Sequence, residues 1–214
     1  MTRLPRHGGM PRTHLALLPT SRYARGQELG VLAGLRSLAP RHALSLDEAE
    51  QLAEAQAEQL LRLARLTAPP TPSALITELP RVLVRVDVDL PASGGTHWVN
   101  GRWLLLINGS EPATRQRFSL AHEYKHALDH RHRSLLYQDR GRTSAETQAE
   151  LAADEFAAAL LMPRSWVLAA WNRGHQRLST LAHLFDVSPH AMARRLQTLE
   201  LRPAFANRYD RKAA

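Results

Sequence analysis

Apolar side chains recur three and four positions apart between residues 115 and 128, the spacing that places them on one face of an α-helix. A face of this kind is buried when the helix packs against other elements. The stripe consists of Phe118, Ala121, Tyr124, Ala127 and Leu128. We therefore expect this segment to be a helix packed on a core.

Two more helices are indicated by their start signals. Segment 45–66 opens with Ser-x-x-Glu, the capping-box pattern, and is followed by the proline-rich break 68–72. Residues 143–146 read Thr-Ser-Ala-Glu, the same pattern, and open a run rich in alanine and leucine that Pro163 ends. Both segments are therefore predicted to be helices, the second of about five turns.

Strand patterns lie between the first of these helices and segment 115–128. Residues 81–88 alternate between apolar and polar side chains. Residues 96–99 and 102–108 flank Asn100-Gly101, a strong signal for a type I′ hairpin. The sequence therefore predicts an α+β fold in which a small antiparallel sheet packs on helices.

Near the C-terminus, segment 178–201 has the spacing of two short helices joined by a tight turn, as in a helix-turn-helix. Ser188-Pro189 provides a clear start for the second helix. Such a pair could carry Arg194 and Arg195 into a DNA groove. We favour the other use, in which the helices pack on the rest of the protein or dock a substrate.

The net charge of +8 is concentrated at the two ends of the chain. Residues 1–43 contain seven arginines and one acid, and residues 202–212 are also predominantly basic. We divide the chain into a basic, flexible extension (1–44), a central domain (45–175), a helical appendage (176–201) and a basic tail (202–214). Solvated ends explain the charge better than DNA binding, because neither end shows a base-reading motif.

The chain contains no cysteine, which excludes disulfides and thiolate metal sites and leaves histidine and carboxylate chemistry. Its longest early apolar run, residues 15–18, is too short for a signal peptide, and no segment approaches a membrane span. We expect a cytoplasmic protein with no membrane partner.

Residues 122–126 read His-Glu-Tyr-Lys-His. Side chains four apart lie one turn above each other on a helix, so His122 and His126 can direct two imidazoles at one metal ion. Glu123 projects to the side, within reach of a metal-bound water. The motif predicts a Zn²⁺ or Mn²⁺ site, with Glu123 as the general base.

A third protein ligand is needed, and the residues offer two candidates. His132 has the spacing of the longer motif HExxHxxGxxH, although Asp129 replaces the glycine at which that motif turns. Glu150 is the second candidate. It shares a predicted helix face with Asp154, which could accept the free N–H of a ligand histidine.

Taken together, Arg115-x-Arg-Phe-x-x-Ala-His-Glu-x-x-His126 and Glu150-x-x-Ala-Asp-x-Phe-Ala-Ala-x-Leu-Leu-Met-Pro163 resemble the ImmA/IrrE family of metallo-endopeptidases over roughly residues 45–201. The resemblance implies a gluzincin-like fold, a metal held by His122, His126 and Glu150, and Glu123 as general base. It also implies cleavage of a helix-turn-helix repressor of a mobile element or stress operon. Many members have glycine where this chain has Lys125, which we expect to point away from the metal.

An edge strand beside the metal would bind the substrate as an added strand, and our candidate is the arm Trp103–Asn108 or its neighbour. Cleavage also needs a donor that stabilises the oxyanion, and the candidates are Tyr124, His130 and Tyr137. The alternative function is a regulatory or antitoxin-like binding protein with a closed structural metal site. His130 or His132 would be the fourth ligand of such a site.

Overall fold

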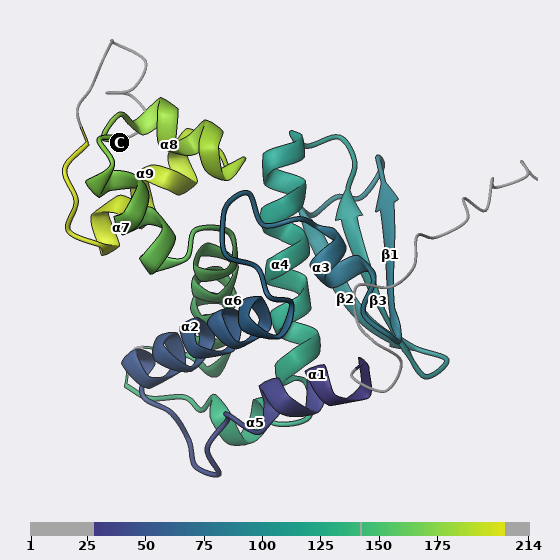
Figure 1. Ribbon diagram of the computed structural model, residues 1–214. Helices are drawn as coiled ribbons and strands as arrows, with labels where there is room; N and C mark the ends of the chain where they lie inside the picture. The colour runs from purple at the N-terminus through teal and green to yellow at the C-terminus, as the bar shows by residue number, and fades with distance from the viewer. Residues whose placement is uncertain (1–27, 142, 204–214) are drawn as a thin grey trace, which may run out of the picture.

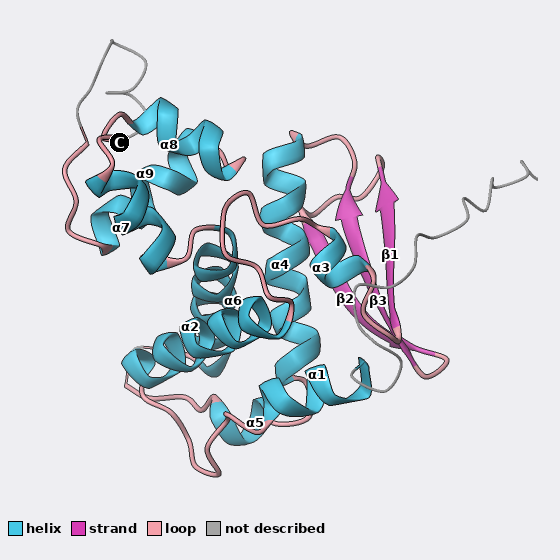
Figure 2. Cartoon of the chain, viewed as in Figure 1, coloured by secondary structure: helices cyan, strands magenta, loops and turns pink. Residues whose placement is uncertain are grey.

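The computed structural model describes residues 28–141 and 143–203, which form an α+β fold (Figures 1 and 2). The helices are α1 (Glu28–Arg36), α2 (Leu46–Leu63), α3 (Ala74–Thr77), α4 (Ala113–Asp129), α5 (Arg133–Leu136), α6 (Ala145–Leu161), α7 (Arg164–Asn172), α8 (Leu178–Phe185) and α9 (Pro189–Thr198). The strands are β1 (Val82–Asp87), β2 (Gly94–Val99) and β3 (Arg102–Asn108). Among the described residues, no helix combines the length and apolar composition needed to cross a membrane.

Helix α4 lies at the centre of the fold, with the sheet on one side and α6 and α2 on the other (Figure 1). This position explains why α4 has buried residues around much of its circumference, including Ser119, Lys125 and Asp129 as well as the predicted apolar stripe. The predicted helix over residues 115–128 is confirmed.

The predicted start signal is confirmed for α2 and lies one residue too early for α6. Ser45 and Glu48 form the predicted capping box at α2. At α6 the N-cap is Ser144, whose hydroxyl accepts a hydrogen bond from the backbone N–H of Thr147 at 3.0 Å. The predicted box over residues 143–146 is therefore one residue early, because Ser144 can cap the helix as well as Thr143 can.

The sheet is mixed, so the prediction of an antiparallel sheet was wrong for one of its pairs. The strand order is β1-β3-β2, with β2 antiparallel and β1 parallel to β3. The hairpin is confirmed, since Asn100 and Gly101 both have positive φ angles, as a type I′ turn requires. The parallel pair arises because segment 88–101, which contains β2, is long enough to return the chain in the direction of β1.

This order places β3 in the middle of the sheet and β2 at the edge that contacts α4. Trp103, Leu105 and Ile107 of β3 point into the core. The arm Trp103–Asn108 therefore cannot add a further strand, and its neighbour β2 is the edge strand beside the metal-motif helix.

Part of the segment expected to be a flexible extension belongs to the core. Val31 and Leu35 of α1 are buried, and so is Leu44. Arg36 holds α1 against α4, since its guanidinium donates hydrogen bonds to the carbonyls of Ala127 and Leu128. The sequence suggested a flexible segment because it is short and rich in arginine. The remainder of the predicted extension, residues 1–27, lies outside the described residues.

The two C-terminal helices are present where the sequence predicts them, with Asp186 in the left-handed conformation between them and Ser188 capping α9. They share a second apolar core with the end of α6 and with α7. Arg195 of α9 is buried, and its guanidinium contacts Glu155 of α6 at 2.7 Å and Glu54 of α2 at 3.0 Å. The pair therefore packs firmly on the rest of the protein, and Arg195 is unable to reach DNA.

Candidate metal centre

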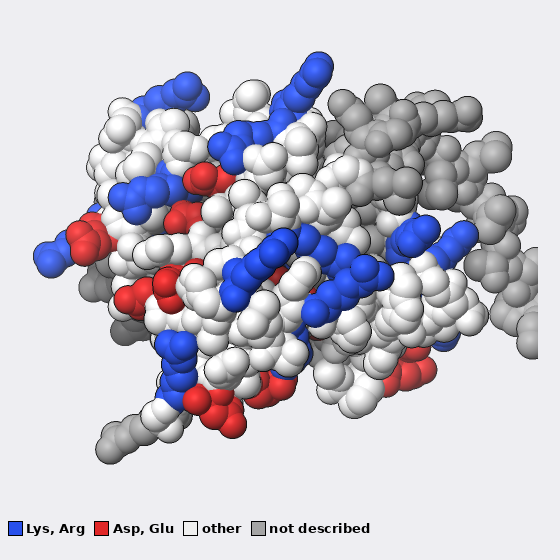
Figure 3. Space-filling view, turned by 90° about the horizontal axis from the view of Figure 1, so that it is seen from below, with Lys and Arg blue, Asp and Glu red and all other residues white. Residues whose placement is uncertain are grey.

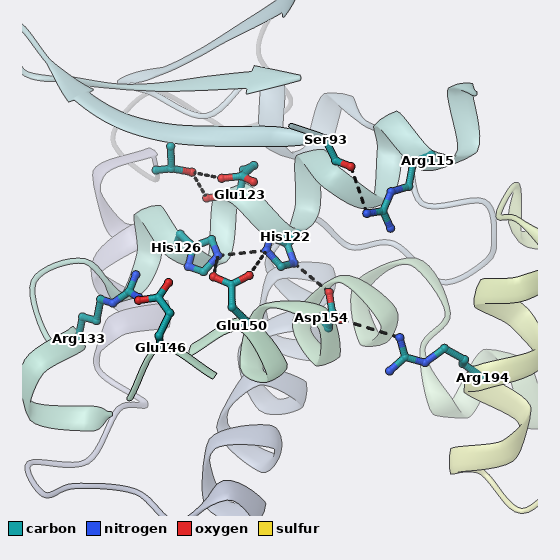
Figure 4. Close-up of polar contacts among 11 residues, drawn as sticks. Ser93, Arg115, His122, Glu123, His126, Arg133, Glu146, Glu150, Asp154 and Arg194 are labelled. Atoms are coloured by element: carbon teal, nitrogen blue, oxygen red, sulfur yellow. Dashed lines mark hydrogen bonds and ion pairs between the residues drawn. The ribbon is translucent and has the colours of Figure 1, made fainter. Parts of the chain in front are cut away.

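Two histidines of α4 and one glutamate of α6 converge at the crossing of these helices (Figure 4). His122 Nε2 and His126 Nε2 lie 3.1 Å apart, and each lies 3.3 Å from a carboxylate oxygen of Glu150. In the described part of the chain, these are the residues whose ligand atoms gather within 4.8 Å of one another. The structure thus selects Glu150 over His132 as the third member of the group.

The convergence follows from the local sequence of both helices. His122 and His126 are one turn apart on α4, and Glu150 and Asp154 are one turn apart on α6. On α6 the neighbouring buried side chains are small, which lets this helix approach its neighbours closely. These side chains are Ala149, Ala152, Ala153 and Ala157.

The three ligand atoms fit a tetrahedral zinc ion. With metal–ligand distances near 2.1 Å, neighbouring ligand atoms of a tetrahedron lie about 3.4 Å apart. The two Nε2 atoms lie 3.1 Å apart, and each lies 3.3 Å from a different carboxylate oxygen of Glu150, which is close to this value. Two imidazoles and one carboxylate are also the ligands found in catalytic zinc sites that keep one position for water.

Asp154 fixes the orientation of His122. His122 Nδ1 donates a hydrogen bond to Asp154 Oδ1 at 3.0 Å, which leaves Nε2 with its lone pair toward the centre of the group. Burial alone would raise the pKa of Asp154, but the hydrogen bond and charge of His122, helped by Arg194, hold that pKa below its usual range. Asp154 therefore stays ionised and keeps its role as acceptor.

The protonation of the two histidines differs. Burial, reinforced by His122 and Arg133, lowers the pKa of His126 to about 4, so this imidazole is neutral and able to bind a metal at neutral pH. Burial also opposes protonation of His122, but its hydrogen bond to Asp154 and the nearby carboxylates outweigh it, and the pKa of His122 is raised. A metal ion at His122 would thus compete with a proton for the imidazole.

Glu123 lies beside the three ligands, under strand β2. Thr96 Oγ1 lies 2.7 Å from Glu123 Oε2 and 2.8 Å from the backbone carbonyl of the same residue. Burial raises the pKa of Glu123, although the hydrogen bond from Thr96 and the charge of His122 oppose this. A buried carboxylate with a raised pKa has the properties of a general base that must later return the proton.

Gly94 permits the close approach of β2 to this carboxylate. A Cβ atom at Gly94 would lie 2.7 Å from Glu123 Oε1 and 2.8 Å from its Cγ, closer than real Cβ atoms come. The sequence analysis missed Gly94 and Thr96. The Gly94-Gly95 pair was the available signal, since glycine inside a strand often marks a place where another group comes close.

A cavity of about 340 Å³ opens over the three ligands. It is lined by β2, by α4, by Glu150 of α6, by His130 in the turn after α4 and by Arg133 at the start of α5. Of the three candidates for stabilising an oxyanion, His130 is the one that lines this cavity. Tyr124 is buried near Phe156, and Tyr137 donates its hydroxyl to the buried carboxylate of Asp129.

Comparison with known proteins gives the family. The model of the peptidase M78 family, described as the IrrE N-terminal-like domain, matches residues 78–197, more than half of the chain. The chain belongs to the peptidase M78 family. This confirms the resemblance to ImmA/IrrE proteins and identifies the domain as that of a metallopeptidase family, which implies a metal cofactor.

A solved structure of a Mycobacterium tuberculosis transcriptional regulator shares the fold, with a TM-score of 0.53 over 81% of this chain. The two sequences are 16% identical, and the chain covers 53% of that protein. At this identity the likeness concerns the fold alone. A search of curated proteins returned no match.

Lys125 lies where the sequence predicts it, away from the candidate ligands. Its side chain is buried on the side of α4 away from the ligands, where the ammonium group lies 2.6 Å from Asp129 and donates a hydrogen bond to Gln56 of α2 at 2.7 Å. Asp129 is therefore the paired last residue of α4, and it does not adopt the left-handed conformation that the glycine of the HExxHxxGxxH motif allows.

Proposed function

We propose that the protein is a zinc-dependent endopeptidase with a gluzincin-like centre. His122, His126 and Glu150 would hold the metal, and Glu123 would be the general base. The observation that carries the proposal is the placement of Glu123 beside a tetrahedrally spaced His-His-Glu group that opens into a cavity. Membership of a metallopeptidase family supports it.

Bound at this site, Zn²⁺ would polarise the scissile carbonyl and lower the pKa of a water molecule. Glu123 would take the proton from the attacking water and later deliver it to the leaving amine. Thr96 holds the Glu123 carboxylate in place through its hydroxyl. Asp154 keeps His122 in the tautomer and orientation that metal binding needs.

Strand β2 is our candidate for substrate binding. It is the edge strand that contacts α4, and Gly94, Gly95 and Thr96 line the cavity over the three ligands. A substrate segment added to this edge would be extended, with its backbone held across the metal. An extended segment is also the form in which a peptide bond is most accessible to attack.

We infer that the substrate is a specific regulator, with a helix-turn-helix repressor as the first candidate. Members of this family are expected to cleave such repressors, and a peptidase acting among other cellular proteins must be restrained by its choice of substrate. Direct contact with DNA is not favoured. Arg195 is buried, and on the face shown in Figure 3 acidic side chains are spread along with the basic ones.

The alternative, a non-proteolytic binding protein with a structural metal, needs a closed four-ligand site. Among the described residues, neither His130 nor His132 joins the ligand group. Glu150 is half exposed and the cavity over the group is open, which supports a site with room for water and substrate.

The decisive experiment incubates the zinc-loaded protein with the helix-turn-helix repressor encoded beside its gene and identifies products by mass spectrometry. We expect a single cut in the repressor, with no cut by the metal-free protein or by Glu123→Gln. An intact repressor together with a metal that is bound but inaccessible to water would favour the structural-metal alternative. Ready degradation of casein would contradict the proposed selectivity.

The ligand assignment predicts a clear order of metal affinities. Glu150→Ala should weaken zinc binding strongly, whereas His132→Ala should leave it nearly unchanged, because His132 is not part of the converging group. Asp154→Ala should be intermediate, with a loss of about 10- to 100-fold, as is usual for groups that orient a ligand. Titration of the metal-free variants with Zn²⁺ measures all three, and the reverse order for Glu150 and His132 would refute the assignment.

Gly94→Ala should lower cleavage by about 100-fold without loss of metal, because a misplacement of a catalytic group by about 1 Å can cost that much. The added methyl would overlap the Glu123 carboxylate. Gly95→Ala is the matched control, since its methyl would meet only the end of the His97 ring, at 3.4 Å. Equal rates for the two variants, measured at equal zinc content, would show that close approach at Gly94 has no functional value.

A further inference from the structure

A second cavity lies between α4, α6 and α9, on the side of Asp154 away from the zinc ligands. Its volume is about 260 Å³. Helix α9 supplies one wall through Ala191 and Arg194, and the cavity reaches α6 at Leu151 and Ala158. The C-terminal helices therefore build part of a concave site that the metallopeptidase helices alone would leave open.

This cavity adjoins the candidate catalytic site. A third cavity, of about 300 Å³, contains His122, Glu123 and Glu150, and it shares Arg115, Phe118 and Asp154 with the cavity beside α9. Figure 4 shows Arg115 and Arg194 on the same side of the zinc ligands, with Asp154 between Arg194 and His122. A polypeptide lying across the ligands could thus place a neighbouring side chain in the cavity.

The lining indicates which side chain would fit. Its apolar part combines helices α4, α6 and α9 and the segment that follows α6. This part consists of Phe118, Leu151, Ala158, Met162 and Ala191. The buried charge of Arg195 is already compensated by Glu54 and Glu155, so it does not demand a charged ligand.

The mouth is polar. Arg115 and Arg194 are more than half exposed, and each has an ion pair of 3.9 Å, to Glu111 and Asp154 respectively. Such long, exposed pairs contribute little. Arg115 also donates a hydrogen bond to Ser93 at 3.3 Å and lies over the Phe118 ring, so Arg194 is the more weakly held of the two guanidinium groups. The volume also suffices, because a cavity of about 150 Å³ accommodates benzene.

We propose that this cavity is the specificity subsite of the peptidase and accepts a large apolar side chain, such as that of leucine, methionine or phenylalanine, next to the scissile bond. The inference rests on the proposed function of the metal centre. It gives the C-terminal helices a direct role, since α9 forms a wall of the subsite and selects the substrate.

The test measures binding and does not depend on cleavage. Two peptide hydroxamates that differ only in leucine or glycine next to the metal-binding group are titrated calorimetrically into the zinc-loaded full chain. Burial of a leucine side chain predicts that the leucine compound binds about 10- to 100-fold more tightly. Ala158→Phe and Ala191→Phe, which fill the cavity from different helices, should remove this preference and leave binding of the glycine compound unchanged.

Ala169→Phe, at an exposed position of α7 that does not line the cavity, is the matched control and should keep the preference. Thermal unfolding checks that each variant is folded. If one of the two cavity-filling variants does not fold, the other is sufficient for the test. Equal binding of both compounds to the wild type would overturn the subsite while leaving the metal centre intact. A preference for the leucine compound that persists in Ala158→Phe and Ala191→Phe would do the same. Failure of the glycine compound to bind zinc-loaded protein would instead overturn the proposed function, and the subsite with it.

Discussion

Glu123→Gln is expected to reduce cleavage of the repressor by about 100- to 10,000-fold, the range that a general base contributes. Glutamine has nearly the shape of glutamate and can still accept the hydrogen bond that Thr96 Oγ1 gives to the carboxylate at 2.7 Å. It cannot take a proton from water. The loss should therefore appear in the chemical step, and a single-turnover assay with excess zinc-loaded protein would measure it directly.

Two controls make this result interpretable. The zinc content of the variant should equal that of the wild type, because Glu123 is outside the group of three ligand atoms. Its thermal stability should also be unchanged or higher, since the substitution removes a carboxylate whose burial raises its pKa. A variant that retains cleavage within about tenfold of the wild type would exclude Glu123 as the general base.

Much of the site could be predicted because its chemistry depends on helical periodicity. The spacing of His122 and His126 places both imidazoles on one face, and the spacing of Glu150 and Asp154 does the same for the carboxylates. Sequence reasoning could also exclude thiolate ligands. The local signals at Ser45 and at Asn100-Gly101 were confirmed for the same reason, since a cap or a two-residue turn is decided by residues close in sequence.

The features that escaped prediction depend on contacts between distant segments. Strand β1 pairs in parallel with β3 because of the path of the chain between them, which no residue pattern in β1 itself records. The approach of Gly94 to Glu123 joins residues of a strand and a helix, and glycine in a strand has several explanations. Burial of Arg195 could not be read from an arginine-rich helix, because its partners come from α2 and α6.

The burial of Arg195 also changes how the C-terminal helices should be tested. Deleting residues 176–214 would remove the apolar side chains of α8 and α9 and leave Glu54 and Glu155 without their cation. Loss of cleavage after such a deletion would therefore mix instability with loss of substrate binding. Single substitutions in the cavity wall separate the two effects.

A buried polar network connects the metal-motif helix to the helices that support it. Lys125 and Asp129 of α4 form an ion pair of 2.6 Å, with side chains 1% and 7% exposed. Gln56 of α2 accepts from Lys125 and donates to the backbone carbonyl of Leu35, and Tyr137 donates its hydroxyl to Asp129. Burial lowers the pKa of Lys125 and Asp129 opposes that shift, so the ammonium group depends on its partner to remain charged.

Asp129→Ala is therefore expected to lower the free energy of unfolding by about 3 to 5 kcal/mol, the usual cost of leaving one member of a buried pair without its partner. Adding Lys125→Met should restore much of this loss, because replacing both charges with apolar groups of similar volume is often neutral. Urea unfolding of the metal-free protein measures both values. A cost below about 1 kcal/mol for Asp129→Ala, or a double variant less stable than the single one, would show that this buried pair does not stabilise the fold.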